Sequence, residues 1–265
     1  MIIQSLQTDY YRIPLPVVLS DASHGEVTHF DFVTARITTA DGLEGVGYTF
    51  TPGTGGAAIH AHIDRDLRGV LLGADAGRIE QLWKRMWWHV HFAGRGGALT
   101  LAISAVDIAL WDLAGKRAGE PWWRFFGGCE NRVRAYAGGV DLQFTLDALV
   151  AQTEGFLERG FRAIKMKVGR PNLSEDVERV ARLRQILGPD QPLMVDGNMG
   201  WRVDEAIRAA RAFAEHGVYW IEEPTIPDDY EGHARIAREG GVPVATGETV
   251  FARAGISAVL SQQIL

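Results

Sequence analysis

The chain has 265 residues, of which 46% are apolar and 23% charged, and its formal net charge is −6 at pH 7. This length and composition indicate a globular protein with one large core or two domains, and the acidic balance without a Lys/Arg block argues against a nucleic-acid partner. Cys129 stands alone, the N-terminus has no basic leader, and no segment approaches the roughly 20 apolar residues that span a bilayer, so we expect a cytoplasmic protein without a membrane partner.

Residues 1 to about 50 are predicted to form strands and turns. The run 30–39 is rich in β-branched and aromatic residues, and Asp41-Gly42 marks a hairpin whose return strand is 44–50. Two polar loops interrupt this region, at 20–25 and 51–56, and the second is rich in glycine and threonine.

The segment 57–118 has helical periodicity. Ile79, Leu82, Trp83 and Met86 recur at the spacing of one helix face. A glycine-rich break that contains Arg95 separates this helix from a long apolar helix over 99–117.

From about residue 130 onward, strands and helices alternate in five units. This alternation predicts a parallel sheet with right-handed crossovers, and the nearly continuous apolar runs predict strands that are buried on both faces. The fold class is therefore α/β, with part of a TIM-like (β/α) barrel. The predicted strands are 132–137, 163–168, 192–196, 218–222 and 243–246, and the predicted helices are 145–158, 174–187, 203–216, 229–239 and 252–263.

Three acidic residues follow successive strands at equal steps of 26 residues: Asp196, Glu222 and Glu248. Functional residues of a parallel α/β barrel lie at the carboxyl ends of its strands. Each acid alone is more often a strand-end cap or a salt-bridge partner, but together they predict a site for Mg²⁺ or Mn²⁺. Asn198 could share the face of Asp196 and bind substrate, or simply form a turn. Glu223 should point away from Glu222.

Two lysines, Lys165 and Lys167, lie on another apolar run. Residues i and i+2 share a face of a strand, so both ammonium groups point the same way. Desolvation and mutual repulsion would lower a lysine pKa toward that of a general base. A solvated strand face is the alternative.

A lysine base beside Mg²⁺ is suited to one reaction. The base removes the proton α to a carboxylate, and the metal stabilises the resulting enediolate. Reprotonation of that anion gives racemisation or epimerisation, and loss of a β-substituent gives dehydration.

Several motifs together resemble the enolase superfamily, and within it the mandelate racemase-like group. Their shared features are a K-x-K pair, a D-x-N, an I-E-E-P, a third acid after glycine and a helical signature in which Asp112 and Lys116 form an i, i+4 pair. Superfamily sites with a Lys or His base and Mg²⁺ are a known pattern. The matching segments are Lys165-Met166-Lys167, Asp196-Gly197-Asn198, Ile221-Glu222-Glu223-Pro224, Gly247-Glu248 and 102–116.

The resemblance implies roles for these residues. Asp196, Glu222 and Glu248 would bind Mg²⁺, Lys167 would be the base, and Lys165 would lower its pKa and hold the substrate carboxylate. Because muconate-lactonising relatives usually have Asp at the third acid, Glu248 favours the racemase and acid-sugar dehydratase branch.

The resemblance also implies two domains. Residues 1–125 would form an α+β capping domain with lid loops, and residues 126–265 a partial barrel that carries the metal site. His24 and Arg95 would contact a small carboxylate or acid-sugar substrate, although a lone loop histidine is more often simply solvated.

The chain departs from the family pattern at its C-terminal side. Members usually continue through further strands that carry a second base, a His paired with an Asp, whereas the last histidine here is His233. Five parallel strands cannot close an eight-stranded barrel. We therefore expect a fragment of a longer protein, another chain that covers the open edge, as in a homo-oligomer, or a truncated, catalytically incomplete remnant that folds poorly. A barrel aldolase with a Schiff-base lysine is a further alternative, which leaves the acid spacing unexplained.

Overall fold

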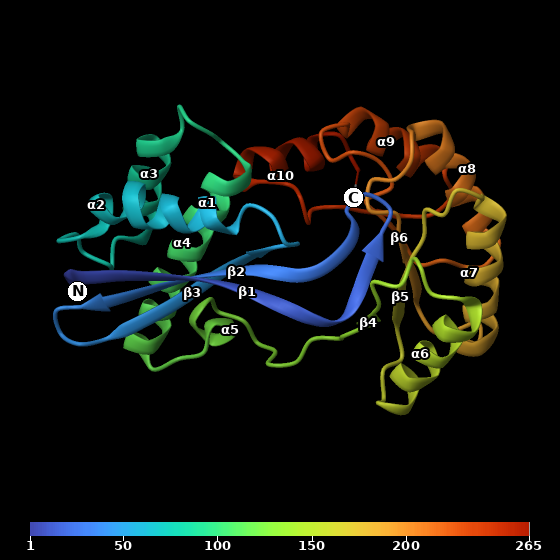
Figure 1. Cartoon of the computed structure of the whole chain (residues 1–265), viewed down its shortest axis with the longest axis horizontal. Coiled ribbons are helices and arrows are strands. Elements are labelled where there is room, and N and C mark those ends of the chain that lie inside the picture. Colours follow the sequence, from blue (N-terminus) through green and yellow to red (C-terminus); the bar gives the residue numbers. More distant parts are fainter. Residues whose placement is uncertain (265) are drawn as a thin grey trace. The chain divides into compact units, whose positions relative to one another are not determined.

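The computed structural model describes residues 1–264. By internal contacts the chain divides into two units, Met1–Val17 with Thr28–Val133, and Val18–Val27 with Arg134–Leu265. Figure 1 labels the elements of both units. The segment Val18–Val27, which is the tip of the ribbon formed by the first two strands, thus belongs to the second unit.

Unit 1 is built on a three-stranded sheet in the order β1-β2-β3, with strands β1 (Ile3–Asp21), β2 (Gly25–Thr39) and β3 (Glu44–Thr51). Strands β2 and β3 are antiparallel, and the predicted Asp41-Gly42 turn joins them, with Gly42 at φ +83°. The predicted loop 20–25 is shorter than expected because β1 continues to Asp21 and β2 already begins at Gly25.

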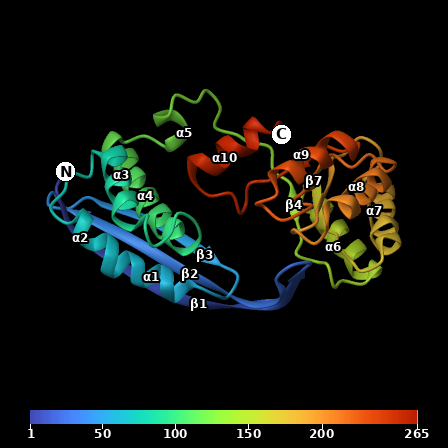
Figure 2. The ribbon, with the colours of Figure 1, turned by 90° about the horizontal axis from the view of Figure 1, so that it is seen from above.

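Helices cover one side of this sheet, as Figure 2 shows for α3 and α4. The closest packing is between α4 and β3, where glycine is required. A Cβ atom at Gly47 would lie 2.0 Å from the Ala105 carbonyl oxygen, and one at Gly45 would lie 2.2 Å from that of Ala109. The helices of unit 1 are α1 (Gly56–Ala61), the π-helix η1 (His62–Leu67), α2 (Arg68–Leu71), α3 (Ile79–Val90), α4 (Gly97–Ala118) and α5 (Trp122–Phe125).

Helix α4 corrects one expectation, because it is long and apolar enough by length and composition to cross a membrane. In this structure it is a core helix of unit 1, with Val106, Leu110 and Leu113 fully buried. The predicted Asp112–Lys116 pair is present at 2.7 Å, and the Asp112 carboxylate also accepts a hydrogen bond from the Val46 amide of β3.

Within residues 1–264, unit 2 contains a five-stranded parallel sheet in the order β4-β5-β6-β7-β8, which confirms the predicted α/β fold class. Helices α6 to α9 follow along the outer side of the strands (Figure 1). The strands are β4 (Ala137–Gly138), β5 (Ile164–Lys167), β6 (Leu193–Asp196), β7 (Ile221–Glu222) and β8 (Val244–Ala245), and the helices are α6 (Leu146–Glu158), α7 (Leu173–Leu187), α8 (Val203–Ala214), α9 (Tyr230–Glu239) and α10 (Ala252–Ser261).

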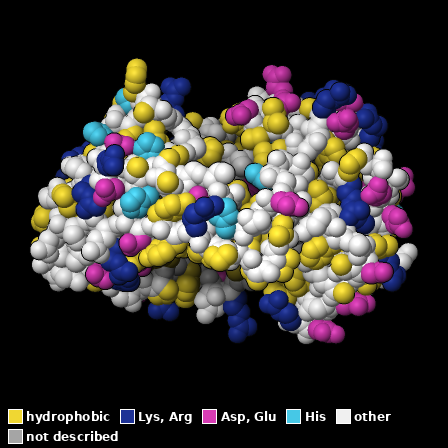
Figure 3. All heavy atoms as spheres, viewed as in Figure 1, with side chains coloured by type: hydrophobic (Ala, Val, Ile, Leu, Met, Phe, Trp, Pro, Cys, Tyr) yellow, Lys and Arg dark blue, Asp and Glu magenta, His cyan; other side chains and the backbone are white. Residues whose placement is uncertain are grey.

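The prediction of a strand over 132–137 was wrong in extent. The chain pairs only at Ala137 and Gly138, and Val133 is 91% exposed, so that part of the run has no neighbouring strand. The core of unit 2 lies between the sheet and the helices, with Met166, Val195, Ile221 and Phe213 fully buried. On the surface in Figure 3, acidic and basic side chains are interspersed.

Candidate active and metal site

The predicted lysines and two of the predicted acids meet at the carboxyl ends of three adjacent strands. In the register of the sheet, Lys167 of β5 is the partner of Asp196 of β6, and Asp196 is the partner of Glu222 of β7. Parallel strands align their carboxyl ends at one edge of the sheet, so residues far apart in the chain become direct neighbours.

The lysines form ion pairs with these acids. Lys167 Nζ donates to Asp196 Oδ2 at 2.8 Å, and Lys165 Nζ lies 2.6 Å from Glu222 Oε1 and 3.1 Å from Asp196 Oδ2. The Asp196 side chain is 1% exposed and those of both lysines are less than 15% exposed. One ammonium group therefore bridges two carboxylates in a place that water scarcely reaches.

This arrangement changes the expected electrostatics. Burial lowers the pKa of Lys165, but the charges of Asp196 and Glu222 and the hydrogen bonds to them outweigh it, and the net pKa is raised. The second lysine and burial alone would lower a lysine pKa, but at Lys165 the two neighbouring carboxylates outweigh them.

Two buried side-chain oxygen atoms that follow the paired acids in sequence lack a hydrogen-bond partner in the described part of the chain. Asn198 and Glu223 are both buried, and neither Asn198 Oδ1 nor Glu223 Oε2 has a hydrogen-bond partner among residues 1–264. Both residues have left-handed backbones at φ +40°, a conformation that costs energy outside glycine and that clusters at functional sites. Asn198 lies in a turn rather than on an extended strand, since β6 ends at Asp196.

Glu223, which was predicted only to point away from Glu222, forms hydrogen bonds with the loop after β8. Its Oε1 accepts hydrogen bonds from the amide and hydroxyl of Thr249, which ties the end of β7 to the loop after β8. Burial raises the pKa of Glu223, and the nearby charges of Glu248 and Asp196 raise that pKa further, against the hydrogen bonds from Thr249.

The third predicted acid, Glu248, is not in the cluster. It is exposed in the loop after β8, and within residues 1–264 no three His, Cys, Asp or Glu side chains gather around one metal position. The donor chemistry nevertheless suits a hard divalent cation, because the carboxylates of Asp196 and Glu222 are adjacent. The ammonium of Lys165 marks the place between them where positive charge is favoured.

The two predicted substrate contacts have different surroundings. His24 lies in segment 18–27 of unit 2, and its Nδ1 is 2.9 Å from Asp21 Oδ2, with a side chain 40% exposed. Arg95 is exposed in the turn between α3 and α4 of unit 1.

Two aromatic residues near Lys165 were not predicted as part of the site. Trp220 Nε1 donates to Glu222 Oε2 at 3.2 Å, and the Tyr136 ring lies 5.7 Å from Lys165 Nζ. Their rings pack edge to face. Each of these residues lies in a predicted strand, and an aromatic residue in a strand is typical of packing rather than of a site.

A buried polar network below Lys167 was also missed, with Asp141 and Asp176 at 0% exposure and Arg179 at 3%. The sequence of helix α7 could have predicted this network. Asp176 and Arg179 occupy the same face as Val180, Leu183 and Leu187, and charged residues on a core face require partners.

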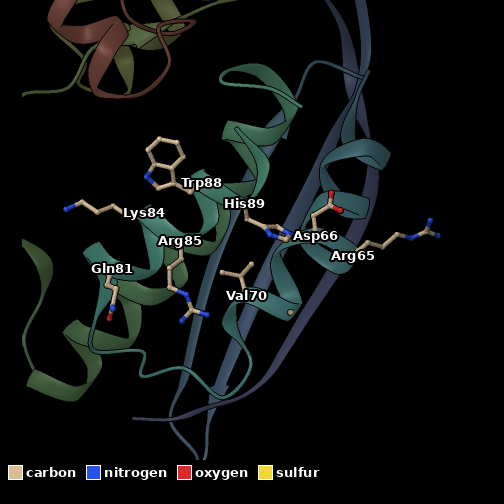
Figure 4. Close-up of a pocket in the computed structure, with 9 residues that line it drawn as sticks. Arg65, Asp66, Val70, Gln81, Lys84, Arg85, Trp88 and His89 are labelled. Atoms are coloured by element: carbon tan, nitrogen blue, oxygen red, sulfur yellow. The ribbon is translucent and has the colours of Figure 1, made fainter. Parts of the chain in front are cut away.

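A groove of about 830 Å³ lies in unit 1, between η1, α2 and α3 (Figure 4). Arg65 and Lys84 point to opposite sides of it in this view. The one acid in its lining, Asp66, forms an ion pair with His62 and not with a lysine, so the lysine–carboxylate chemistry described above belongs to the strand ends. Its lining residues are Arg65, Asp66, Gly69, Val70, Gln81, Lys84, Arg85, Trp88 and His89.

Comparison with known families gives two matches that together cover most of the chain. Residues 6–127 match the mandelate racemase / muconate lactonizing enzyme N-terminal domain, and residues 148–265 match the enolase C-terminal domain-like family.

Curated relatives include a 3,6-anhydro-alpha-L-galactonate cycloisomerase of Streptomyces coelicolor, 58% identical over 94% of this chain and 69% of the relative. An L-talarate/galactarate dehydratase of Salmonella typhimurium is 38% identical over 89% of this chain and 61% of the relative. The chain thus spans between three fifths and seven tenths of the length of these two relatives.

Solved structures agree with these relatives. A racemase from Streptomyces coelicolor with bound magnesium has a TM-score of 0.98 and 55% identity, covering 100% of this chain and 74% of that one. The Salmonella typhimurium dehydratase with Mg and L-lyxarohydroxamate has a TM-score of 0.94 and 34% identity, covering 99% and 68%. Magnesium in both structures agrees with the predicted cofactor.

Proposed function

Because the chain belongs to the mandelate racemase / muconate lactonizing enzyme family of the enolase superfamily, we propose that it removes the proton α to the carboxylate of an acid sugar, with Mg²⁺ as cofactor. The observation that carries this proposal is the pair of lysines on two adjacent strand-end carboxylates. Dehydration is the favoured outcome, as in the talarate/galactarate dehydratase.

Each residue has a distinct task in this proposal. Asp196, Glu222 and Glu248 would hold Mg²⁺, which when bound stabilises the negative charge that develops on the substrate carboxylate. Lys167 accepts the α-proton. In this structure Lys167 Nζ lies 2.8 Å from Asp196 Oδ2, which places the proposed base directly beside a proposed metal ligand. Lys165 supplies a second positive charge for the carboxylate.

Isomerisation is the second candidate, supported by the 58% identity to a cycloisomerase. Both outcomes begin with loss of the α-proton, so the site described above serves either. The relatives named above are not aldolases, and the Schiff-base alternative has no support among them. A cytoplasmic location and a homo-oligomer remain predictions.

The test is proton exchange in D₂O, followed by ¹H NMR on a panel of aldonic and aldaric acids. We expect one or more acids to lose the α-proton signal only when Mg²⁺ is present, and the Lys167→Ala variant to bind Mg²⁺ without exchange. A 2-keto-3-deoxy product would identify dehydration, and an isomer or cyclic product would identify isomerisation.

A matched control is Lys84→Ala, which removes a lysine from unit 1 and should leave exchange unchanged. If the protein binds Mg²⁺ and exchanges the α-proton of none of these acids, the proposal is wrong for this chain.

A further inference from the structure

The amide of Lys167 lies beyond the last pair of the β4–β5 ladder. Strand β4 pairs with β5 only at Ala137 and Gly138. The amide of Lys167 instead donates to Asp141 Oδ1 at 2.9 Å. A side-chain carboxylate therefore takes the place of a backbone carbonyl and fixes the end of the strand that carries the base.

The Asp141 carboxylate is itself held on several sides. Gln152 Nε2 donates to its Oδ2 at 2.6 Å, and Arg179 Nη2 lies 3.8 Å from its Oδ1. A Cβ atom at Gly139 would lie 2.2 Å from Asp141 Oδ2, so the turn closes tightly over the carboxylate. A fully buried charge is tolerated only with such partners.

The same turn also binds the ribbon segment Val18–Val27. The Leu142 amide donates to the Ser20 carbonyl at 3.3 Å, and Gln143 Nε2 donates to the Val18 carbonyl at 3.0 Å. Ser20 and Asp141 form a parallel bridge. Residues 141–143 therefore contact Lys167 on one side and the ribbon segment on the other.

Two arginines donate hydrogen bonds to backbone carbonyls of the turn at residues 141–144. Arg179 donates to the carbonyls of Asp141 and Leu142, at 3.0 and 2.8 Å. Arg170 donates twice to the Leu142 carbonyl and once to that of Phe144. Displacement of the turn would break several charge-assisted hydrogen bonds together. We therefore expect residues 141–144 to move as a unit.

Ala22, at the tip of the same ribbon, packs against the turns that follow β5 and β6. A Cβ atom at Gly169 or at Gly200 would lie 2.8 Å from the Ala22 Cβ. Gly169 follows β5 by two residues and Gly200 follows β6 by four. The ribbon segment thus rests on the turns after the two strands that end in Lys167 and Asp196.

We propose that Asp141 is a positioning residue that couples docking of segment 18–27 to the placement of Lys167. This inference rests on the proposed function for the role of Lys167 as a base. When the segment docks, its contacts with residues 141–143 hold the turn, and Asp141 in turn holds the Lys167 amide. When the segment lifts, the end of β5 loses its fixed acceptor and the base loses its alignment.

The test is hydrogen exchange of backbone amides in the full chain without substrate. In Asp141→Ala we expect the Lys167 amide and the amides of segment 18–27 to exchange about tenfold faster or more, the effect of losing a hydrogen bond to a buried charge. The amides of β6 should keep their rates. Asp141→Asn retains an acceptor for the Lys167 amide and should restore slow exchange there.

The matched control is Asp176→Ala, another buried acid of the same network. Asp176 accepts from the amides of Gly169 and Arg170 but not from Lys167. We expect faster exchange at those two amides. Exchange over segment 18–27 should rise less than in Asp141→Ala, because Asp176 reaches the segment only through the contact of Gly169 with Ala22, whereas residues 141–143 bind it by hydrogen bonds. Equal acceleration of the segment by both variants, or none in Asp141→Ala, would overturn the proposal.

Wild-type protein provides a second measurement if Asp141→Ala does not fold. Under low denaturant, the Lys167 amide and segment 18–27 should open together in one step, before Val195 of β6. Separate opening would contradict the coupling. A missing α-proton exchange reaction would refute the proposed function without affecting either result. Where that reaction is measurable, Asp141→Ala should lower kcat with little change in KM.

Discussion

Lys167 and Asp196 are paired twice, once as register partners of β5 and β6 and once through an ion pair of 2.8 Å between Nζ and Oδ2. The backbone ladder therefore sets the distance between base and carboxylate before any side chain moves. Lys165, two residues earlier on the same strand, reaches Asp196 as well and extends the bridge to Glu222. The two ammonium groups thus neutralise the two carboxylates at the strand ends.

Lys165→Met should destabilise the metal-free protein and strengthen its response to Mg²⁺. The change leaves Asp196 and Glu222 adjacent with one cation fewer, and removing one partner of a buried ion pair costs about 3–5 kcal/mol. We expect a lower Tm without metal and a larger rise in Tm with Mg²⁺ than in wild type, measured by thermal unfolding. Lys84→Met is the control, and equal Mg²⁺ responses in all three proteins would contradict the competition between ammonium and metal.

Asp107→Asn should stabilise the protein at neutral pH. Burial, and then the charge of Glu80, raises the pKa of Asp107 to about 6. A carboxyl with a raised folded-state pKa destabilises the fold above that value, and the penalty disappears as pH falls through about 6 toward the ordinary value of 3.8. We expect the variant to gain about 1–2 kcal/mol over wild type at pH 7.5 and nothing at pH 4, by urea unfolding.

Glu80→Gln tests the cause of that shift. It removes the smaller contribution and leaves Asp107 buried, so its gain at pH 7.5 should be smaller than that of Asp107→Asn. A gain that is the same at both pH values would show that the effect does not come from ionisation of Asp107.

Gly47→Ala should separate α4 from β3. The added methyl would overlap the Ala105 carbonyl and the Ala109 amide of α4, and overpacking of this kind costs roughly 1–3 kcal/mol. Gly69→Ala is the matched control, because Gly69 is helical and a Cβ atom there meets nothing within 4 Å. Urea midpoints should fall for Gly47→Ala and stay level or rise for Gly69→Ala. Equal midpoints would contradict the close packing.

The parallel sheet and the meeting of Lys167, Asp196 and Glu222 were predictable because apolar runs locate strands, and parallel strands align at their ends. Contacts beyond the strands were not predictable. Asp141 binds an amide 26 residues away through a side chain, and periodicity carries no information on that pairing. The raised pKa of Lys165 likewise depends on which carboxylates it contacts rather than on its neighbour in sequence.

Glu248 illustrates the same limit, and it gives the final prediction. Equal spacing predicted three equivalent acids, but β8 ends at Ala245, so Glu248 lies in the following loop and is exposed.

If the loop brings Glu248 to the metal, Glu248→Gln should weaken Mg²⁺ binding on the order of tenfold, and Asp196→Asn on the order of 100-fold, by isothermal titration calorimetry. Asp196 should matter more because it is already fixed beside Glu222 by the sheet, whereas Glu248 must be ordered on binding. Glu239→Gln, which removes an exposed acid of α9, should bind Mg²⁺ as wild type does. An unchanged affinity in Glu248→Gln would exclude it as a ligand and leave the metal to Asp196, Glu222 and the unpaired oxygens of Asn198 and Glu223.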